Sequence, residues 1–159
     1  VKYAIIGGVA AIYYGRPRTT MDLDVVILLK ERNMERFVNT LKKNGFEAEI
    51  ETIREAFNKK AHVSIFLKDS PYRMDVKGVY SSLDEASLKR RKKVKIFNVD
   101  TWIESPEDLI IAKLVYGSPQ DIEDVKAILL RQEKLNKEYL VKRGKEEKVL
   151  SKLKRLLKR

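Results

Sequence analysis

Residues 5–29, IIGGVAAIYYGRPRTTMDLDVVILL, carry the pattern that decides the fold. The apolar run at residues 3–6 is short enough for a β-strand, and it stops at Gly7 and Gly8. A glycine pair lets the backbone turn tightly and leaves its N–H groups accessible. Residues 9–14 are apolar, as expected of a short helix packed against a sheet.

Two carboxylates mark the strand that follows, and the apolar run after Leu23 predicts that this strand is buried. Asp22 and Asp24 are spaced i and i+2, which places both side chains on one face of a strand. Two like charges at the end of a buried strand need compensation. A divalent cation can supply it, because carboxylates are ligands that magnesium prefers. The alternative is that Asp22 caps a turn and Asp24 pairs with Arg16 or Arg18.

The rest of the first hundred residues predicts further strands and helices of a mixed sheet. The expected elements follow from hydrophobic periodicity, turn residues and the Asn-Gly pair that ends a helix. In chain order they are a helix at 31–44, a half-exposed strand at 46–53, a short helix or loop at 54–60, strands at 61–67 and 72–80 that run antiparallel across a turn, and a last strand at 94–99.

Three polar features of this region have a structural interpretation. Asp75 has Arg73 and Lys77 on the same face of its strand, and an ion pair with either would account for it. His62, the only histidine, is expected to have a structural or surface role. The basic run at 89–95 is expected to end an exposed helix and begin an edge strand, which lysines protect from unwanted pairing. Contact with nucleic acid is the alternative for this run.

The C-terminal part predicts helices only. Residues 105–106, Ser-Pro, form a helix start, and Asp108 completes an arrangement that resembles a capping box. Residues 118–119, again Ser-Pro, start the next helix. After Gln132 the leucines are spaced as in two amphipathic helices around Gly144, in a basic background.

Lys113 stands out in the first of these helices, because a charge among apolar neighbours in mid-helix needs a partner. Asp121 and Asp124 lie one helical turn apart in the next helix and suit a polar cluster with it. An ion pair between Lys113 and one of these carboxylates is one explanation of its position.

Composition narrows the class of protein. The chain has 159 residues, no cysteine and 43% hydrophobic residues, so it can bury an ordinary core but has neither disulfides nor a sulfur-ligated zinc site. No apolar run reaches the ~18 residues of a membrane helix and no charged leader precedes the first strand, which predicts a cytoplasmic protein without membrane contact. The abundant charges and the absence of cysteine favour a thermophile.

The net charge is +11, and residues 131–159, with 12 Lys/Arg and 4 Asp/Glu, contribute +8 of it. An acidic partner or nucleic acid would be attracted to this basic region.

The motifs taken in order resemble those of the polymerase-β-like nucleotidyltransferase superfamily. Gly7-Gly8 is followed after thirteen residues by Asp22-Leu23-Asp24, and a third carboxylate, Asp75, lies between apolar residues on a later strand. The helical stretch that contains Lys113 is similar to that of small nucleotidyltransferases in prokaryotic toxin–antitoxin pairs. The resemblance covers roughly residues 3–130.

The resemblance implies roles for individual residues. Asp22 and Asp24 would hold two Mg²⁺ ions, for which Mn²⁺ can substitute, and Asp75 would complete the site that activates the acceptor hydroxyl. Gly7 and Gly8 would cradle the triphosphate with the N–H groups of a helix start.

Three further residues would contribute to nucleotide binding under the same resemblance. Arg18 and Lys113 would add positive charge at the phosphates, and Thr20 would add a hydroxyl donor. None of these residues identifies the base or the acceptor.

The sequence therefore predicts an α/β (α+β) fold with a mixed sheet flanked by helices, in which residues 1–103 form the core and residues 104–159 a helical region with a basic tail. The expected activity is Mg²⁺-dependent transfer of an NMP from an NTP such as ATP to a hydroxyl of RNA, tRNA included, or of a protein. The expected setting is a toxin–antitoxin pair, with a cognate chain or a second copy as partner. The alternative is an inactive module that binds RNA or an acidic protein through the basic C-terminal region.

Overall fold

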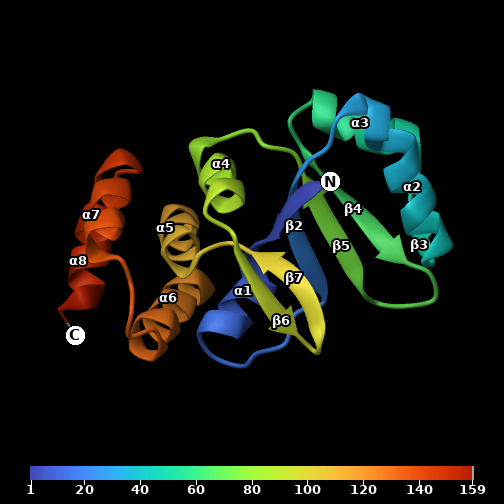
Figure 1. The fold of residues 1–159 in the computed structure, drawn as a ribbon. Coiled ribbons are helices and arrows are strands. Elements are labelled where there is room, and N and C mark those ends of the chain that lie inside the picture. The colour runs from blue at the N-terminus through green and yellow to red at the C-terminus, as the bar shows by residue number, and fades with distance from the viewer. Residues whose placement is uncertain (159) are drawn as a thin grey trace.

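The structure, a computed structural model, describes residues 1–158 and combines one mixed β-sheet with helices on both sides (Figure 1). The seven strands are β1 (Lys2–Ile5), β2 (Asp22–Leu28), β3 (Phe46–Glu47), β4 (His62–Leu67), β5 (Arg73–Lys77), β6 (Lys92–Ile96) and β7 (Val99–Ile103). The helices are α1 (Gly7–Tyr14), α2 (Met34–Lys43), α3 (Ile50–Asn58), α4 (Ser82–Lys89), α5 (Pro106–Tyr116), α6 (Pro119–Arg131), α7 (Lys137–Glu146) and α8 (Leu150–Leu157), with a 3₁₀ turn at Glu31–Asn33 before α2. The predicted fold class is confirmed.

Strand β2 lies in the middle of the sheet, whose order is β3-β4-β5-β2-β1-β7-β6. It pairs antiparallel with β1 and parallel with β5, and the β5 register places Asp24 beside Asp75. On the next strand, β4, Ser64 is the register partner of Asp75. Because register partners share a face of a sheet, the carboxylates predicted to cluster do lie on one face.

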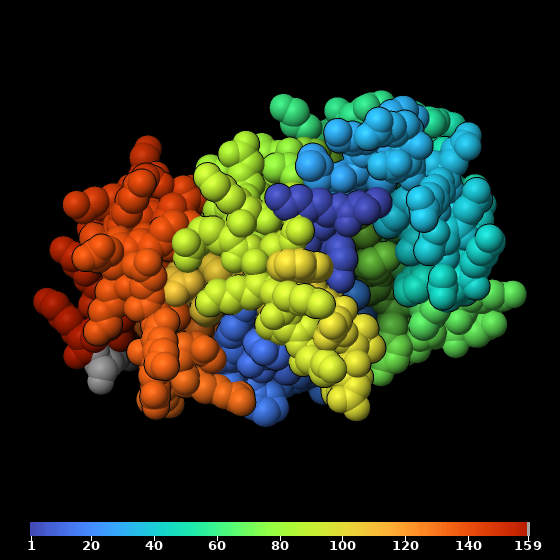
Figure 2. All heavy atoms as spheres, viewed as in Figure 1, coloured from blue at the N-terminus to red at the C-terminus, as the bar shows by residue number. Residues whose placement is uncertain are grey.

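The opposite face of β2, β4 and β5 is apolar and is covered by α2 and α3, whose residues form one buried cluster with it. A second cluster joins β1 and β7 to α1, α5, α6, α7 and α8. It includes Leu140 of α7 and Leu153 of α8, both without exposed surface. In Figure 2 the C-terminal helices, orange to red, form one end of the molecule, and the segment with α2 and α3 lies at the other end. None of the helices within residues 1–158 is long and apolar enough to cross a membrane.

The strand predicted at 46–53 is wrong beyond its first two residues. Strand β3 ends at Glu47, and α3 begins at Ile50. Alternating apolar and acidic residues indicated a strand, but Ile50, Ile53 and Phe57 have helical spacing and pack in the cluster under the sheet. Burial of the helix face that carries Ile50, Ile53 and Phe57 therefore stabilises a helix here rather than a strand.

The strand predicted at 94–99 is correct up to Ile96 and wrong beyond it, because residues 97–98 form the turn of a hairpin. Strands β6 and β7 pair antiparallel, and Ile96 faces Val99 across the two-residue turn of Phe97 and Asn98. Both turn residues have positive φ, 46° and 63°, as a type I′ turn requires. Phenylalanine is an unusual residue for this conformation, so the sequence carries no recognisable turn signal.

The basic run at 89–95 has the predicted structural role. It ends α4 and begins β6, the edge strand of the sheet. Arg90 makes ion pairs with Asp108 and Glu107 and lies over the ring of Tyr139, 3.7 Å from its centroid. The arginine therefore joins α4 to α5 and α7.

The strained turn generates a prediction. Replacing Phe97 by Asn and Asn98 by Gly should stabilise the protein by about 1 kcal/mol, because Asn-Gly adopts a type I′ turn without the cost of positive φ at a bulky residue. Urea unfolding of the double variant measures the gain. Phe97→Ala is the control, since it removes the exposed ring and keeps the unfavourable conformation. An equal gain in the control would contradict this account of the turn.

Candidate active site

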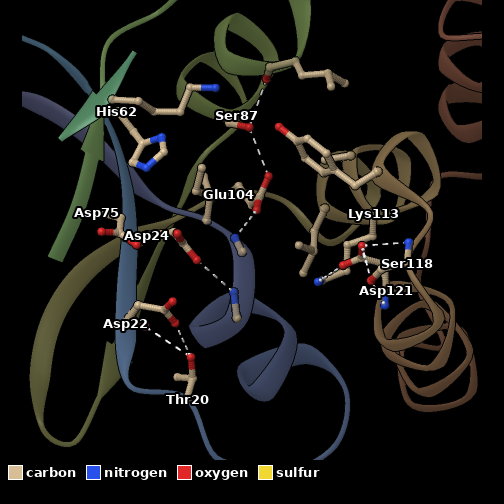
Figure 3. Close-up of a pocket in the computed structure, with 18 of the residues that line it drawn as sticks. Thr20, Asp22, Asp24, His62, Asp75, Ser87, Glu104, Lys113, Ser118 and Asp121 are labelled. Atoms are coloured by element: carbon tan, nitrogen blue, oxygen red, sulfur yellow. Dashed lines mark hydrogen bonds and ion pairs between the residues drawn. The ribbon is translucent and has the colours of Figure 1, made fainter. Parts of the chain in front are cut away.

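A cleft of about 610 Å³ lies between the polar face of the sheet and helices α1, α4 and α5, and this volume suits a small-molecule ligand. Figure 3 shows the three aspartates of the sheet on one side of the cleft, Glu104 in its middle and Lys113 on the far side. The cleft is lined by all eight predicted site residues: Gly7, Gly8, Arg18, Thr20, Asp22, Asp24, Asp75 and Lys113.

Each of the three carboxylates accepts a hydrogen bond, two of them from hydroxyls and one from a backbone amide. Thr20 donates to Asp22 at 2.5 Å, and Ser64 donates to Asp75 at 2.5 Å. Asp24, between them, accepts a longer bond of 3.4 Å from the backbone N–H of Gly8. Thr20 is therefore in the cleft as predicted, and in this structure its hydroxyl orients an aspartate.

The negative charge of Asp24 is not compensated by an ion pair within the described residues. Burial raises the pKa of the Asp24 carboxyl, the Gly8 N–H lowers it, and the negative charges of Asp22 and Asp75 raise it further. Within residues 1–158 no ion pair of Asp24 is present. The alternative pairing of Asp24 with Arg18 does not occur, because Arg18 pairs with Asp124.

Arg73 supplies the positive charge that the other two carboxylates share. Its guanidinium lies 3.0 Å from Asp22 and 3.2 Å from Asp75, so the predicted alternative partner of Asp75 is confirmed. Across the described part of the chain, no three His, Asp or Glu side chains are arranged to hold a metal ion. The donor set nevertheless fits magnesium in its chemistry: three carboxylates lie on one sheet face, and Asp24, the one whose pKa is raised chiefly by burial, has no ion pair.

The glycine pair begins α1 at the edge of the carboxylate cluster. Gly7 has a φ of +64°, and a Cβ there would lie 2.3 Å from the Oδ2 atom of Asp24. Only glycine fits this position, because both the backbone conformation and the space exclude a side chain. The N–H of Gly7 donates to Glu104 at 3.1 Å.

The basic side of the cleft is a buried network. Lys113 contacts Asp121 at 2.8 Å and Asp124 at 2.9 Å, and Arg18 contacts Asp124 at 3.2 Å. Side-chain exposure is only 8% for Lys113 and 1% for Asp124, so these charges depend on one another. The predicted ion pair of Lys113 is confirmed.

Two further side chains, those of His62 and Glu104, line the cleft. His62 is exposed and lines the cleft on β4, where its predicted structural or surface role stays a prediction. Glu104 was not recognised from the sequence, although it is 1% exposed and bonded to Gly7 and Ser87. Burial raises the pKa of Glu104 to about 8. A single acid between β7 and the cap of α5 gives no periodic signal that would have revealed it.

Comparison with solved structures finds the same fold in proteins of low sequence identity. An antigenic nucleotidyltransferase-like protein from Paracoccidioides brasiliensis has a TM-score of 0.58 at 18% identity, over 98% of this chain and 84% of that one. The antibiotic-resistance factor ANT(2″)-Ia, in complex with adenylyl-2″-tobramycin, has a TM-score of 0.58 at 13% identity, over 92% of this chain and 86% of that one. Its solution structure has a TM-score of 0.57 at 15% identity, over 96% and 85%. No curated protein matches the chain.

The sequence itself matches a protein family over nearly its whole length. The match runs from residue 1 to residue 155, so it includes the sheet, the cleft and all the helices apart from the last two residues of α8. This chain belongs to the DUF6036 family, nucleotidyltransferases of unknown function.

Proposed function

We propose that the protein transfers a nucleoside monophosphate from an NTP to a hydroxyl group of RNA or protein, in a Mg²⁺-dependent reaction. The observation that carries the proposal is the grouping of Asp22, Asp24 and Asp75 on one sheet face, in a cleft that also contains a glycine turn and buried cations. Membership in a nucleotidyltransferase family supports the same chemistry.

The nucleotide would lie along the cleft between the glycine turn and the basic network. Helix α1 begins at the cleft, and its positive end would favour the charge of the triphosphate. The N–H groups of Gly7 and Gly8 donate to Glu104 and Asp24 in this structure, so a phosphate would compete with these carboxylates for them. Arg18 and Lys113 line the same cleft, and the Arg18 guanidinium lies close to Gly8. Their side chains offset the negative charge of the phosphates.

Asp22, Asp24 and Asp75 would hold two Mg²⁺ ions, or Mn²⁺ in their place. Bound metal supplies charge neutralisation at the α-phosphate and at the pyrophosphate leaving group. Arg73 would have to release Asp22 and Asp75, because its guanidinium contacts both of them. Ser64 keeps one oxygen of Asp75 oriented through its hydrogen bond.

The reaction forms a bond between the acceptor oxygen and the α-phosphorus and breaks the bond from that phosphorus to pyrophosphate. The hydroxyl proton leaves the acceptor, and Asp75 is the proposed base that takes it. The products are the nucleotidylated acceptor and pyrophosphate. A toxin–antitoxin pair, in which one chain modifies RNA or its partner protein, is the proposed setting.

A second candidate is an inactive module that binds RNA or an acidic protein through the basic C-terminal region. The contacts of Arg73 favour it, because its one guanidinium already pairs with two of the three carboxylates. The net charge of +8 in residues 131–159 would attract such a partner. Binding of this kind should weaken steeply with salt and be indifferent to the aspartates.

Label transfer tests the catalytic proposal. The protein is incubated with each α-labelled NTP and Mg²⁺ or Mn²⁺, with bulk tRNA and cell lysate as acceptors. Transfer by the wild type should fall to background in Asp22→Asn/Asp24→Asn, since these side chains would hold the ions. Asp100→Asn is the matched control, because Asp100 is an exposed aspartate on β7. Absence of transfer with every NTP, together with binding that ignores the aspartates, would favour the second candidate.

Lys113→Met tests the basic side of the cleft. The change leaves Asp121 and Asp124 without their shared cation and should lower the free energy of unfolding by about 3–5 kcal/mol. Lys126→Met is the control on α6, because the ion pair of Lys126 with Glu123 is exposed and should cost less than about 1 kcal/mol.

The same variant separates the structural role of Lys113 from its proposed contact with phosphate. Below its melting temperature, Lys113→Met should bind NTP more weakly than the wild type does. Equal affinity, measured by calorimetry, would restrict Lys113 to the ion pair. A stability loss as small as that of the control would show that the buried network does not depend on this lysine.

A further inference from the structure

Glu104 is a buried acid in the cleft with no role in the proposed reaction. It follows the last residue of β7, and its carboxyl group lies between α1 and α4 (Figure 3). One oxygen accepts the N–H of Gly7 at 3.1 Å, and the other lies 3.0 Å from the hydroxyl of Ser87. The group therefore holds the turn at which α1 begins.

The hydrogen bonds of Ser87 are compatible with a protonated Glu104. The Ser87 hydroxyl lies 3.0 Å from the Leu83 carbonyl oxygen as well as 3.0 Å from Glu104. A hydroxyl has one proton, and a carbonyl oxygen only accepts. Ser87 either shares its proton between the two oxygens or donates to Leu83 and accepts from a protonated Glu104. The second arrangement gives each contact its own proton and fits a neutral carboxylic acid.

The surrounding charges favour the same form. The charged and titratable groups around the carboxyl are Tyr14 from α1, Asp24 from β2, Asp84 from α4 with its partner Lys77, and Asp108 and Lys113 from α5. Lys113 is the cation that would favour ionisation, but it already pairs with Asp121 and Asp124. An ionised Glu104 would thus have no buried cation of its own.

We propose that Glu104 is a positioning residue, which as a neutral acid fixes the Gly7 turn in the conformation that receives the triphosphate. The inference rests on the proposed function, because the ligand is the NTP. A neutral acid accepts the Gly7 N–H without adding charge beside the phosphates. When Glu104 loses its proton, the new negative charge opposes the triphosphate.

Nucleotide affinity should therefore depend on pH through this one group. If only the protonated form binds NTP, the apparent dissociation constant rises by up to about tenfold per pH unit above the pKa of Glu104. Calorimetric titration of the full chain with ATP and Mg²⁺, and then with the other NTPs, measures this rise from neutral to alkaline pH. The midpoint should lie near pH 8.

Glu104→Gln is the decisive variant, because its amide reproduces the neutral acid: the carbonyl accepts from Gly7 and the NH₂ donates to Ser87. Its affinity should match that of the wild type at neutral pH and stay constant at alkaline pH. Glu104→Ala, which offers Gly7 no acceptor, should bind more weakly at every pH. Glu133→Gln, an exposed change, should keep the wild-type profile.

Carbon-13 NMR of the glutamate carboxyls tests the protonation without any nucleotide. The signal absent from Glu104→Gln should titrate near pH 8. A titration in the ordinary range of glutamate, or an alkaline loss of affinity that persists in Glu104→Gln, would overturn the proposal. If no NTP binds at any pH while the carboxyl titrates near pH 8, the proposed function fails and the positioning role fails with it, but the neutral acid is established.

Discussion

The parallel pairing of β2 with β5 is the constraint on which the site depends. Its register sets Asp24 beside Asp75, and the alternation of side chains then assigns all three carboxylates to one face and the apolar residues to the other. A shift of one residue would send the carboxylates into the cluster under α2 and α3, where burial of charge is prohibitive. The same hydrophobic packing that stabilises the sheet thus exposes the carboxylates to the cleft.

Charge is compensated separately on the two sides of this cleft. Arg73 forms ion pairs with Asp22 and Asp75 on the sheet, while Lys113 and Arg18 form ion pairs with Asp124 on the helical side. Glu104 stands between the two groups and bonds to neutral donors and acceptors. A polyanion that enters the cleft therefore meets cations that are already engaged, and its binding must reorganise existing ion pairs.

The sequence predicts the position of a residue well where its type has a single physical role in that context. Three such features lie in the cleft. They are the Asp-x-Asp pair on an apolar strand, the glycine pair at a helix start and the lysine in an apolar helix. The sequence is uninformative where tertiary contacts decide. Ile50 and Ile53 fit a strand or a helix until packing selects the helix, and Phe97 takes a turn conformation that its type disfavours. Glu104 is a single residue, and only the fold brings Gly7 and Ser87 to it.

The contacts of Arg90 connect the helices that line the cleft to the C-terminal helix α7. Arg90 follows α4, binds Asp108 at the start of α5 and lies over the ring of Tyr139 in α7, while the Tyr139 hydroxyl donates to Asp108 at 2.5 Å. Helices α4 and α5 are the wall of the cleft that faces the carboxylates. Helix α7 thus contacts this wall of the cleft through Arg90 and Asp108, so a change that displaces α7 would remove contacts that hold α4 and α5 together.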